Sequence, residues 1–282
     1  MGFGTLAHTV GKRPLQELVD RLASYNIDFV QLALLKAIGD INLSPGKLSP
    51  GLANHIAGQF DKAGIRIGVL GCYINPVHPD PQQRRAEIDR FKEHIRYARD
   101  FGTSIVATET GDLDTFAAQE PERYEEYGWN VLRETVAELA EEAEKWGVHI
   151  GLEPVCVHTL SNPVKMKRIL DEVPSSNLGV VFDPCNLMDQ HNFERRDAVV
   201  DELFELVGDR IVLAHLKDVV YRADGRPNSV KIGQGQFDIE RFFTKLHARK
   251  PYVNISLEDT PEQDLPEVLK YVRALKDTVR SR

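Results

Sequence analysis

Eight apolar segments, each followed by a stretch with helical periodicity, constrain the fold of this chain more than any other feature. Short apolar runs that alternate with amphipathic helices are typical of parallel strands joined by crossover helices. Eight such units predict an α/β fold, a single (β/α)8 TIM barrel with parallel strands. The expected strands are residues 4–10, 28–33, 65–74, 104–110, 149–155, 178–183, 211–217 and 254–258.

One compact domain over residues 1–282 is the simplest organisation for this chain. Its length suits one large barrel, and no low-complexity tract, Ser/Gly-rich linker or block of like charge divides it. A formal net charge of -8 argues against a nucleic acid as the main partner, because phosphate backbones are bound by dense Lys and Arg surfaces.

The three cysteines are an odd and widely spaced set, which fits a reducing compartment rather than a disulfide framework. The sequence contains no secretion signal and no segment with the length and apolarity of a membrane span. We therefore expect a cytoplasmic protein that does not contact a membrane.

Glycine stands at the expected end of several helices, shortly before the next strand. Because glycine takes the left-handed backbone conformation at little cost, it commonly ends helices. We expect that conformation at Gly64, Gly102, Gly147 and Gly208.

Four polar side chains close the apolar runs expected as strands five to eight. They are Glu153, Asp183, His215 and Glu258. In a parallel barrel the carboxyl ends of all strands lie on one face, where catalytic groups gather. The four side chains are therefore predicted to converge at that rim.

These four side chains suit a divalent metal ion. Three carboxylates and one imidazole offer mostly hard oxygen donors, which favour Mn²⁺, Mg²⁺ or Co²⁺ over a closed structural zinc site. With a divalent ion the four groups carry a charge of about -1, so a neutral sugar or polyol is expected rather than a dianion. A six-coordinate ion would keep two positions open for a neighbouring hydroxyl and carbonyl.

Such a site predicts proton transfer on carbon. A metal that holds both oxygens acidifies the intervening C–H bond and stabilises the enediolate, while a carboxylate moves the proton. Glu153 and Glu258 are the expected acid/base pair, because a glutamate can bind the ion with one oxygen and present the other.

Five short motifs together resemble the xylose isomerase-like TIM-barrel superfamily, in its sugar phosphate isomerase/epimerase branch. They are residues 151–154 (Gly-Leu-Glu-Pro), 181–184 (Val-Phe-Asp-Pro), 214–218 (Ala-His-Leu-Lys-Asp), 232–235 (Ile-Gly-Gln-Gly) and 256–259 (Ser-Leu-Glu-Asp). The resemblance implies that Glu153, Asp183, His215 and Glu258 bind one divalent ion, with Mn²⁺ expected first and Mg²⁺, Co²⁺ or Zn²⁺ as alternatives. It also implies a small sugar-type substrate and is compatible with a homo-oligomer.

The sequence departs from parts of this family. Many relatives place a substrate-binding His where Asn186 stands, and an amide cannot shuttle protons near neutral pH. For the epimerase Arg after strand seven, Tyr221 and Arg222 are both near the right distance. The family's trinuclear nucleases need further His ligands, which Asn186 and residues 228–230 (Asn-Ser-Val) do not supply.

Other residues are candidates for substrate binding. Asn186 can exchange hydrogen bonds with a hydroxyl, and Glu109 ends the expected strand four. His8 ends strand one, Tyr73 follows strand three, and Lys217 follows His215. Lys217 and Asp218 are further expected to orient His215, as groups behind a metal-bound imidazole commonly do.

Two alternative functions remain open at this point. With a leaving group β to the carbonyl, the same groups would act as a lyase of the inosose dehydratase or keto-glycoside-cleaving type. The other alternative is a sugar-binding barrel without catalytic activity.

Overall fold

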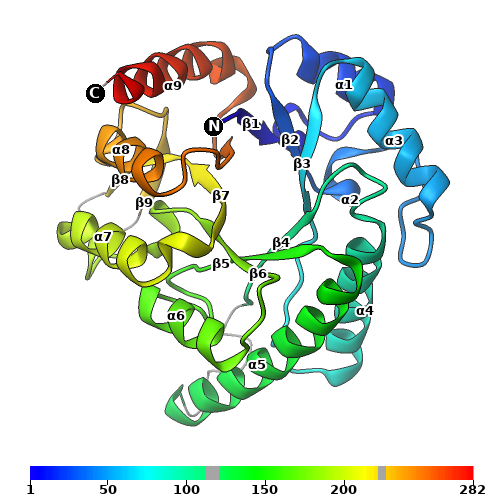
Figure 1. The fold of residues 1–282 in the computed structure, drawn as a ribbon, viewed down its shortest axis with the longest axis vertical. Helices are drawn as coiled ribbons and strands as arrows, with labels where there is room; N and C mark the ends of the chain where they lie inside the picture. The colour runs from blue at the N-terminus through cyan, green and yellow to red at the C-terminus, as the bar shows by residue number, and fades with distance from the viewer. Residues whose placement is uncertain (112–120, 222–226, 282) are drawn as a thin grey trace.

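The computed structural model describes residues 1–111, 121–221 and 227–281, and its centre is a closed barrel of eight parallel strands (Figure 1). The strands are β1 (Phe3–Leu6), β2 (Phe29–Leu32), β3 (Arg66–Gly71), β4 (Ile105–Glu109), β5 (His149–Glu153), β6 (Leu178–Phe182), β7 (Ile211–Leu216) and β10 (Ile255–Leu257). Their order around the barrel is β1-β10-β7-β6-β5-β4-β3-β2, so each strand pairs with the barrel strands before and after it in sequence. The predicted TIM barrel is confirmed.

Helices surround the barrel on its outer side (Figure 1). They are α1 (Leu15–Ala23), α2 (Leu34–Ala37), α3 (Pro50–Lys62), α4 (Pro81–Tyr97), α5 (Pro121–Trp146), α6 (Pro163–Glu172), α7 (Arg196–Val207), α8 (Ile239–Arg249) and α9 (Leu265–Arg280). In the described part of the chain, none of them combines the length and apolarity that crossing a bilayer requires.

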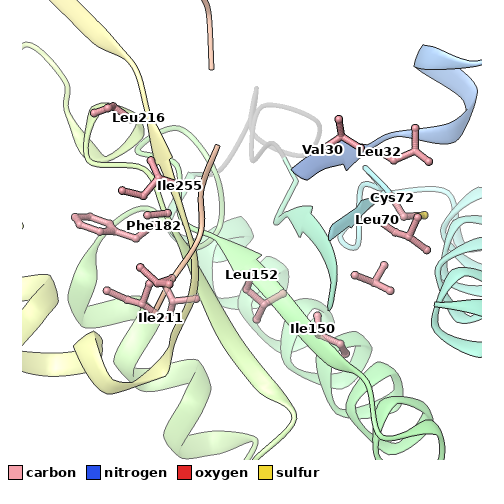
Figure 2. Packing of buried hydrophobic residues seen from close by; sticks show 14 of the residues in the cluster. Val30, Leu32, Leu70, Cys72, Ile150, Leu152, Phe182, Ile211, Leu216 and Ile255 are labelled. Carbon is pink, nitrogen blue, oxygen red and sulfur yellow. The ribbon is translucent and has the colours of Figure 1, made fainter. Parts of the chain in front are cut away.

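The main hydrophobic core lies between the strands and the helices. Alternate strand residues face this layer, because successive side chains of a strand point to opposite sides. Figure 2 shows several of them, including Val30 and Leu32 of β2, Ile150 and Leu152 of β5, and Phe182 of β6. All five are at most 1% exposed. Because these side chains point outward to the helices, the residues between them on each strand point into the barrel.

A second, smaller apolar layer fills the barrel interior. It consists of strand residues only, namely Phe29, Val69, Ala107, Val181 and Leu213. The ring of Phe29 packs against Gly68, where a Cβ atom would lie only 2.5 Å from the ring. The polar groups at the carboxyl ends of the strands lie next to this apolar layer.

Helix boundaries follow the expected chemistry with one exception. Gly64, Gly102 and Gly147 have φ values of 75°, 80° and 62°, as predicted for glycines that end helices. The prediction was wrong for Gly208, whose φ is -55° because the chain continues from α7 into a 3-10 turn, Gly208–Arg210.

Two features of the strands differ from the prediction. The first strand ends at Leu6, and His8 lies in a following 3-10 helix, Ala7–Val10, rather than at the strand end. After β7 the chain forms an antiparallel pair, β8 (Asp218–Tyr221) and β9 (Pro227–Val230), which was not predicted. Tyr221 of this pair stacks on Phe193 at 4.1 Å between ring centroids, while Arg222 lies outside the described residues.

Glu138 of α5 joins this helix to α4 through ion pairs with Arg85 and Lys92. Hydrogen bonds from Arg85 hold the pKa of Glu138 at about 2, below its usual value of 4.5. A carboxylate with a lowered folded-state pKa stabilises the protein above about pH 4.5, and this contribution is lost as the pH falls towards 2.

Glu138→Gln is therefore expected to lower the free energy of unfolding by about 1 kcal/mol at pH 7, since solvent screens this half-exposed pair. The difference from the wild type should shrink below about pH 4.5. Urea unfolding at pH 7 and pH 3.5 measures both values, with Glu141→Gln on the exposed side of α5 as the control. A difference that persists unchanged at pH 3.5 would contradict this assignment.

Candidate metal centre

A polar layer lies directly above the apolar layer of the barrel interior. Side chains two residues apart share one face of a strand, so the residue two positions after an interior side chain also faces the barrel axis. The polar residues placed in this way are Gln31 on β2, Glu109 on β4, His215 on β7 and Asp183, which directly follows β6, whereas Glu153 ends β5 two residues after Gly151. Glu258 follows β10 directly, two residues after the buried Ser256.

The structure brings together the four side chains that the sequence predicts to converge. Glu153, Asp183, His215 and Glu258 each offer one ligand atom, and these atoms all lie within 4.8 Å of one another. Glu153, Asp183 and His215 are at most 3% exposed. Their proximity results from closure of the barrel, because they lie at or directly after the carboxyl ends of four different strands.

His215 lies between two carboxylates. Its Nδ1 atom is 3.2 Å from Glu153 Oε1 and 3.0 Å from Glu258 Oε2. Burial lowers the pKa of His215, but the two carboxylates outweigh burial and raise that pKa well above its usual value. The Nδ1 atom is thus the ring nitrogen that faces the candidate site.

Gln31 holds the opposite side of this ring and was not predicted as a site residue. His215 Nε2 lies 2.9 Å from Gln31 Oε1, and Gln31 Nε2 donates to the hydroxyl of Tyr73 at 3.0 Å. The ammonium of Lys36 lies 4.2 Å from the centre of the Tyr73 ring. A polar side chain inside the apolar strand Phe29–Leu32 was the available sequence signal for Gln31.

Lys217 contacts the carboxylates instead of His215. Its Nζ atom donates to Asn186 Oδ1 at 2.7 Å and lies 3.3 Å from Asp183 Oδ2. Asn186 Nδ2 in turn donates to Glu153 Oε1 at 2.7 Å. The prediction that Lys217 orients His215 was therefore wrong, since Glu153, Glu258 and Gln31 surround that ring.

Asp218 binds backbone N–H groups of a nearby loop instead of orienting His215. Its carboxylate accepts backbone N–H groups from Val219, Gly233, Gly235 and Phe237, at 3.0, 3.0, 2.8 and 3.3 Å. These contacts tie residues 232–238, the glycine loop that follows β9, to the start of β8. The prediction that Asp218 orients His215 was wrong, because its side chain is used by this loop.

Gly235→Ala is expected to displace the glycine loop, since a Cβ atom there would lie 2.0 Å from Asp218 Oδ1 and 2.8 Å from the Val219 carbonyl oxygen. We expect a loss of about 1–3 kcal/mol in the free energy of unfolding. Gly58→Ala in α3 is the control, because nothing lies within 4 Å of its added Cβ and alanine favours a helix. Equal melting temperatures for the two variants would contradict the proposed role of the loop contacts.

The carboxylates of the cluster oppose one another electrostatically. Burial raises the pKa of Asp183 to about 7. Burial has the same tendency at Glu258, but the charges of His215 and Lys217 outweigh it and lower that pKa. Asp183 Oδ2 lies 3.3 Å from Lys217 Nζ and Glu258 Oε2 lies 3.0 Å from His215 Nδ1, but among the described residues neither oxygen has an aligned hydrogen-bond donor. Two buried carboxylate oxygens without an aligned donor, within reach of an imidazole and a third carboxylate, fit a divalent cation.

Glu109 and His8 lie farther out than the four central residues. Glu109 pairs in register with Glu153 across β4 and β5, and its side chain is 40% exposed. Burial and the charge of Glu153 raise the pKa of Glu109. Burial lowers the pKa of His8, Lys36 lowers it further, and Glu258 opposes both. The charges of the cluster therefore act on both residues, although neither forms a hydrogen bond or ion pair with His215.

The barrel and this polar cluster define the class of protein. A family model described as xylose isomerase-like TIM barrel matches residues 19–275. The chain belongs to this family.

Individual relatives are more distant. An uncharacterised protein of Methanocaldococcus jannaschii is 23% identical over 254 residues, covering 87% of this chain and 79% of that protein. A solved structure named D-tagatose 3-epimerase-like protein has a TM-score of 0.79 at 19% identity, covering 100% of this chain and 99% of its own. The IOLI protein, solved with a bound zinc atom, has a TM-score of 0.77 at 17% identity, covering 99% of both chains. At these identities the structural similarity establishes the fold alone.

Proposed function

We propose that the protein is a divalent-metal-dependent isomerase or epimerase of a sugar or sugar derivative. It would move a proton on the carbon next to a carbonyl group. The observation that carries this proposal is the position of two glutamates around one imidazole. Glu153 and Glu258 approach His215 Nδ1 at 3.2 and 3.0 Å from strands that are not neighbours in the barrel.

Glu153, Asp183, His215 and Glu258 would hold the ion. Mn²⁺ is the expected metal, with Mg²⁺, Co²⁺ and Zn²⁺ as alternatives, because the donors are mostly carboxylate oxygens. When bound, the ion would supply Lewis-acid stabilisation of the enediolate. The zinc atom named in the IOLI structure supports a metal site in this fold.

The two glutamates would carry out the proton transfer. Glu258 would bind the ion through Oε2, which lies 3.0 Å from His215 Nδ1, and its other carboxylate oxygen would take the proton from carbon. Glu153, held by Asn186 and His215, would start protonated and from the other side give its proton to the same carbon or to its neighbour, and exchange with solvent would then reset both glutamates. The first outcome is epimerisation and the second is isomerisation, and neither changes the oxidation state of the substrate as a whole.

The surrounding polar side chains would bind the substrate. Asn186 and Lys217 lie against the carboxylates, Tyr73 ends the hydrogen-bonded series that starts at His215, and Glu109 and His8 lie farther out. Hydroxyl groups of a sugar can both donate to and accept from such residues. The name of the D-tagatose 3-epimerase-like structure supports a sugar as the substrate class.

Exchange with solvent deuterium tests this function. The protein is incubated with a panel of keto-sugars in D₂O with Mn²⁺, and the products are examined by NMR spectroscopy. We expect deuterium on the carbon next to the carbonyl and no unsaturated product. An unsaturated product would replace the proposal with a lyase, and bound sugars without exchange would replace it with a sugar-binding protein.

A further inference from the structure

A lysine is built into the group of carboxylates at the candidate metal centre. Lys217 lies between β7 and β8 and is 9% exposed. Its Nζ atom lies 3.3 Å from Asp183 Oδ2 and 3.8 Å from Glu258 Oε2. These are the two buried oxygens that have no aligned hydrogen-bond donor among the described residues.

We propose that Lys217 is a fixed counter-charge that weakens the binding of the divalent ion by this centre. The inference rests on the proposed metal site and adds a residue that limits its affinity. A divalent ion held by the same oxygens would lie close to the ammonium group of Lys217. Two cations in a buried site repel each other more strongly than in water, because few solvent dipoles separate them.

Lys217 is anchored in this position. Its ammonium donates to Asn186 Oδ1 at 2.7 Å, and Asn186 Nδ2 donates to Glu153 Oε1 at 2.7 Å. The backbone N–H of Asn186 also donates to Asp183 Oδ1 at 3.2 Å, so the amide is held from both ends. Moving the ammonium into solvent would leave the Asn186 carbonyl and Asp183 Oδ2 without their cationic neighbour. Repulsion is therefore the expected result of metal binding, rather than escape of the lysine.

The positive charge of Lys217 changes the net charge expected for the metal-loaded site. Three carboxylates and a divalent ion sum to -1, and the ammonium of Lys217 brings the sum to zero with a neutral imidazole. A site without net charge accepts a neutral sugar. It also holds a positive group close to the negative charge that develops when carbon loses its proton.

A purely structural role for Lys217 predicts the opposite effect on metal affinity. If Lys217 only arranges Asn186 and the carboxylates, then replacing it disturbs the ligands and weakens metal binding. If Lys217 is a competing cation, then a neutral replacement strengthens metal binding. The sign of the change in affinity therefore separates the two roles.

The experiment is a calorimetric titration of the chelator-stripped protein with Mn²⁺ for the wild type, Lys217→Met and Lys217→Arg. We expect Lys217→Met to bind Mn²⁺ about tenfold more tightly or better, because repulsion is removed. Lys217→Arg keeps the charge and should stay within about threefold of the wild type. Lys62→Met, at the exposed end of α3, is the control and should leave the affinity unchanged.

Equal or weaker binding by a folded Lys217→Met would overturn the inference while leaving the proposed function intact. Lys217→Gln provides a second neutral side chain if the methionine variant does not fold, with the same expected result. A wild-type protein that binds no divalent ion would overturn the proposed function together with this inference. Circular dichroism establishes that each variant is folded before titration.

Discussion

Glu258→Gln is expected to lower kcat/KM for the proposed reaction by about 10³-fold or more, while the protein remains folded. Glutamine keeps the shape of the side chain but cannot take a proton from carbon. It also replaces a charged oxygen that lies 3.0 Å from His215 Nδ1 by an amide. Steady-state kinetics with the keto-sugar found in the deuterium experiment measures the effect.

The control for this variant is Glu205→Gln on the exposed face of α7, which should retain full activity. Deuterium exchange separates the chemical step from binding, because the variant should still bind the sugar but incorporate little deuterium at the reacting carbon. If Glu258→Gln retained more than a tenth of the wild-type exchange rate, Glu258 would not be the proton-transferring group.

His215→Ala is expected to raise the Kd for Mn²⁺ by about 100-fold or more, since residues that only support a metal ligand already change affinity by 10- to 100-fold. The substitution removes the imidazole that lies between Glu153 and Glu258, and so leaves two carboxylates facing each other. Titration of the chelator-stripped variant measures this affinity. His55→Ala on the exposed side of α3 serves as the control.

The stability of the metal-loaded protein gives an independent measurement for His215. An ion that binds only the folded state raises the melting temperature, and this increase depends on its affinity. Mn²⁺ should therefore raise the melting temperature of the wild type and of His55→Ala more than that of His215→Ala. An equal increase in all three proteins would place the bound ion elsewhere.

The fold and the four central residues could be predicted because both depend on local patterns. Apolar runs alternating with helices define the barrel, and the carboxyl end of each run gives the positions of Glu153, Asp183, His215 and Glu258. Their convergence follows from the closure of the sheet. Their roles as metal ligands and acid/base groups stay predictions.

The contacts among these groups could not be predicted, because they join distant parts of the chain. Gln31 and His215 are 184 residues apart, and no local periodicity relates them. Lys217 follows the imidazole in sequence, yet it turns to Asp183 and Asn186. Position along a strand indicates which side chains reach the carboxyl-terminal rim of the barrel. The hydrogen-bond and ion-pair partners of each side chain depend on charges and distances that exist only in the closed barrel.

The antiparallel pair of β8 and β9 was missed for a similar reason. Each strand has four residues, too few for a clear alternating pattern, and β9 begins with a proline. The role of Asp218 in holding the glycine loop also depends on this pair, because β9 returns the chain to the end of β7.

Anomalous diffraction from crystals grown with Mn²⁺ tests the central claim most directly, because it locates the ion. The arrangement of side chains predicts one strong peak per chain, surrounded by Glu153, Asp183, His215 and Glu258. A peak at another position, or no peak at a concentration of Mn²⁺ that supports activity, would contradict the proposed metal centre.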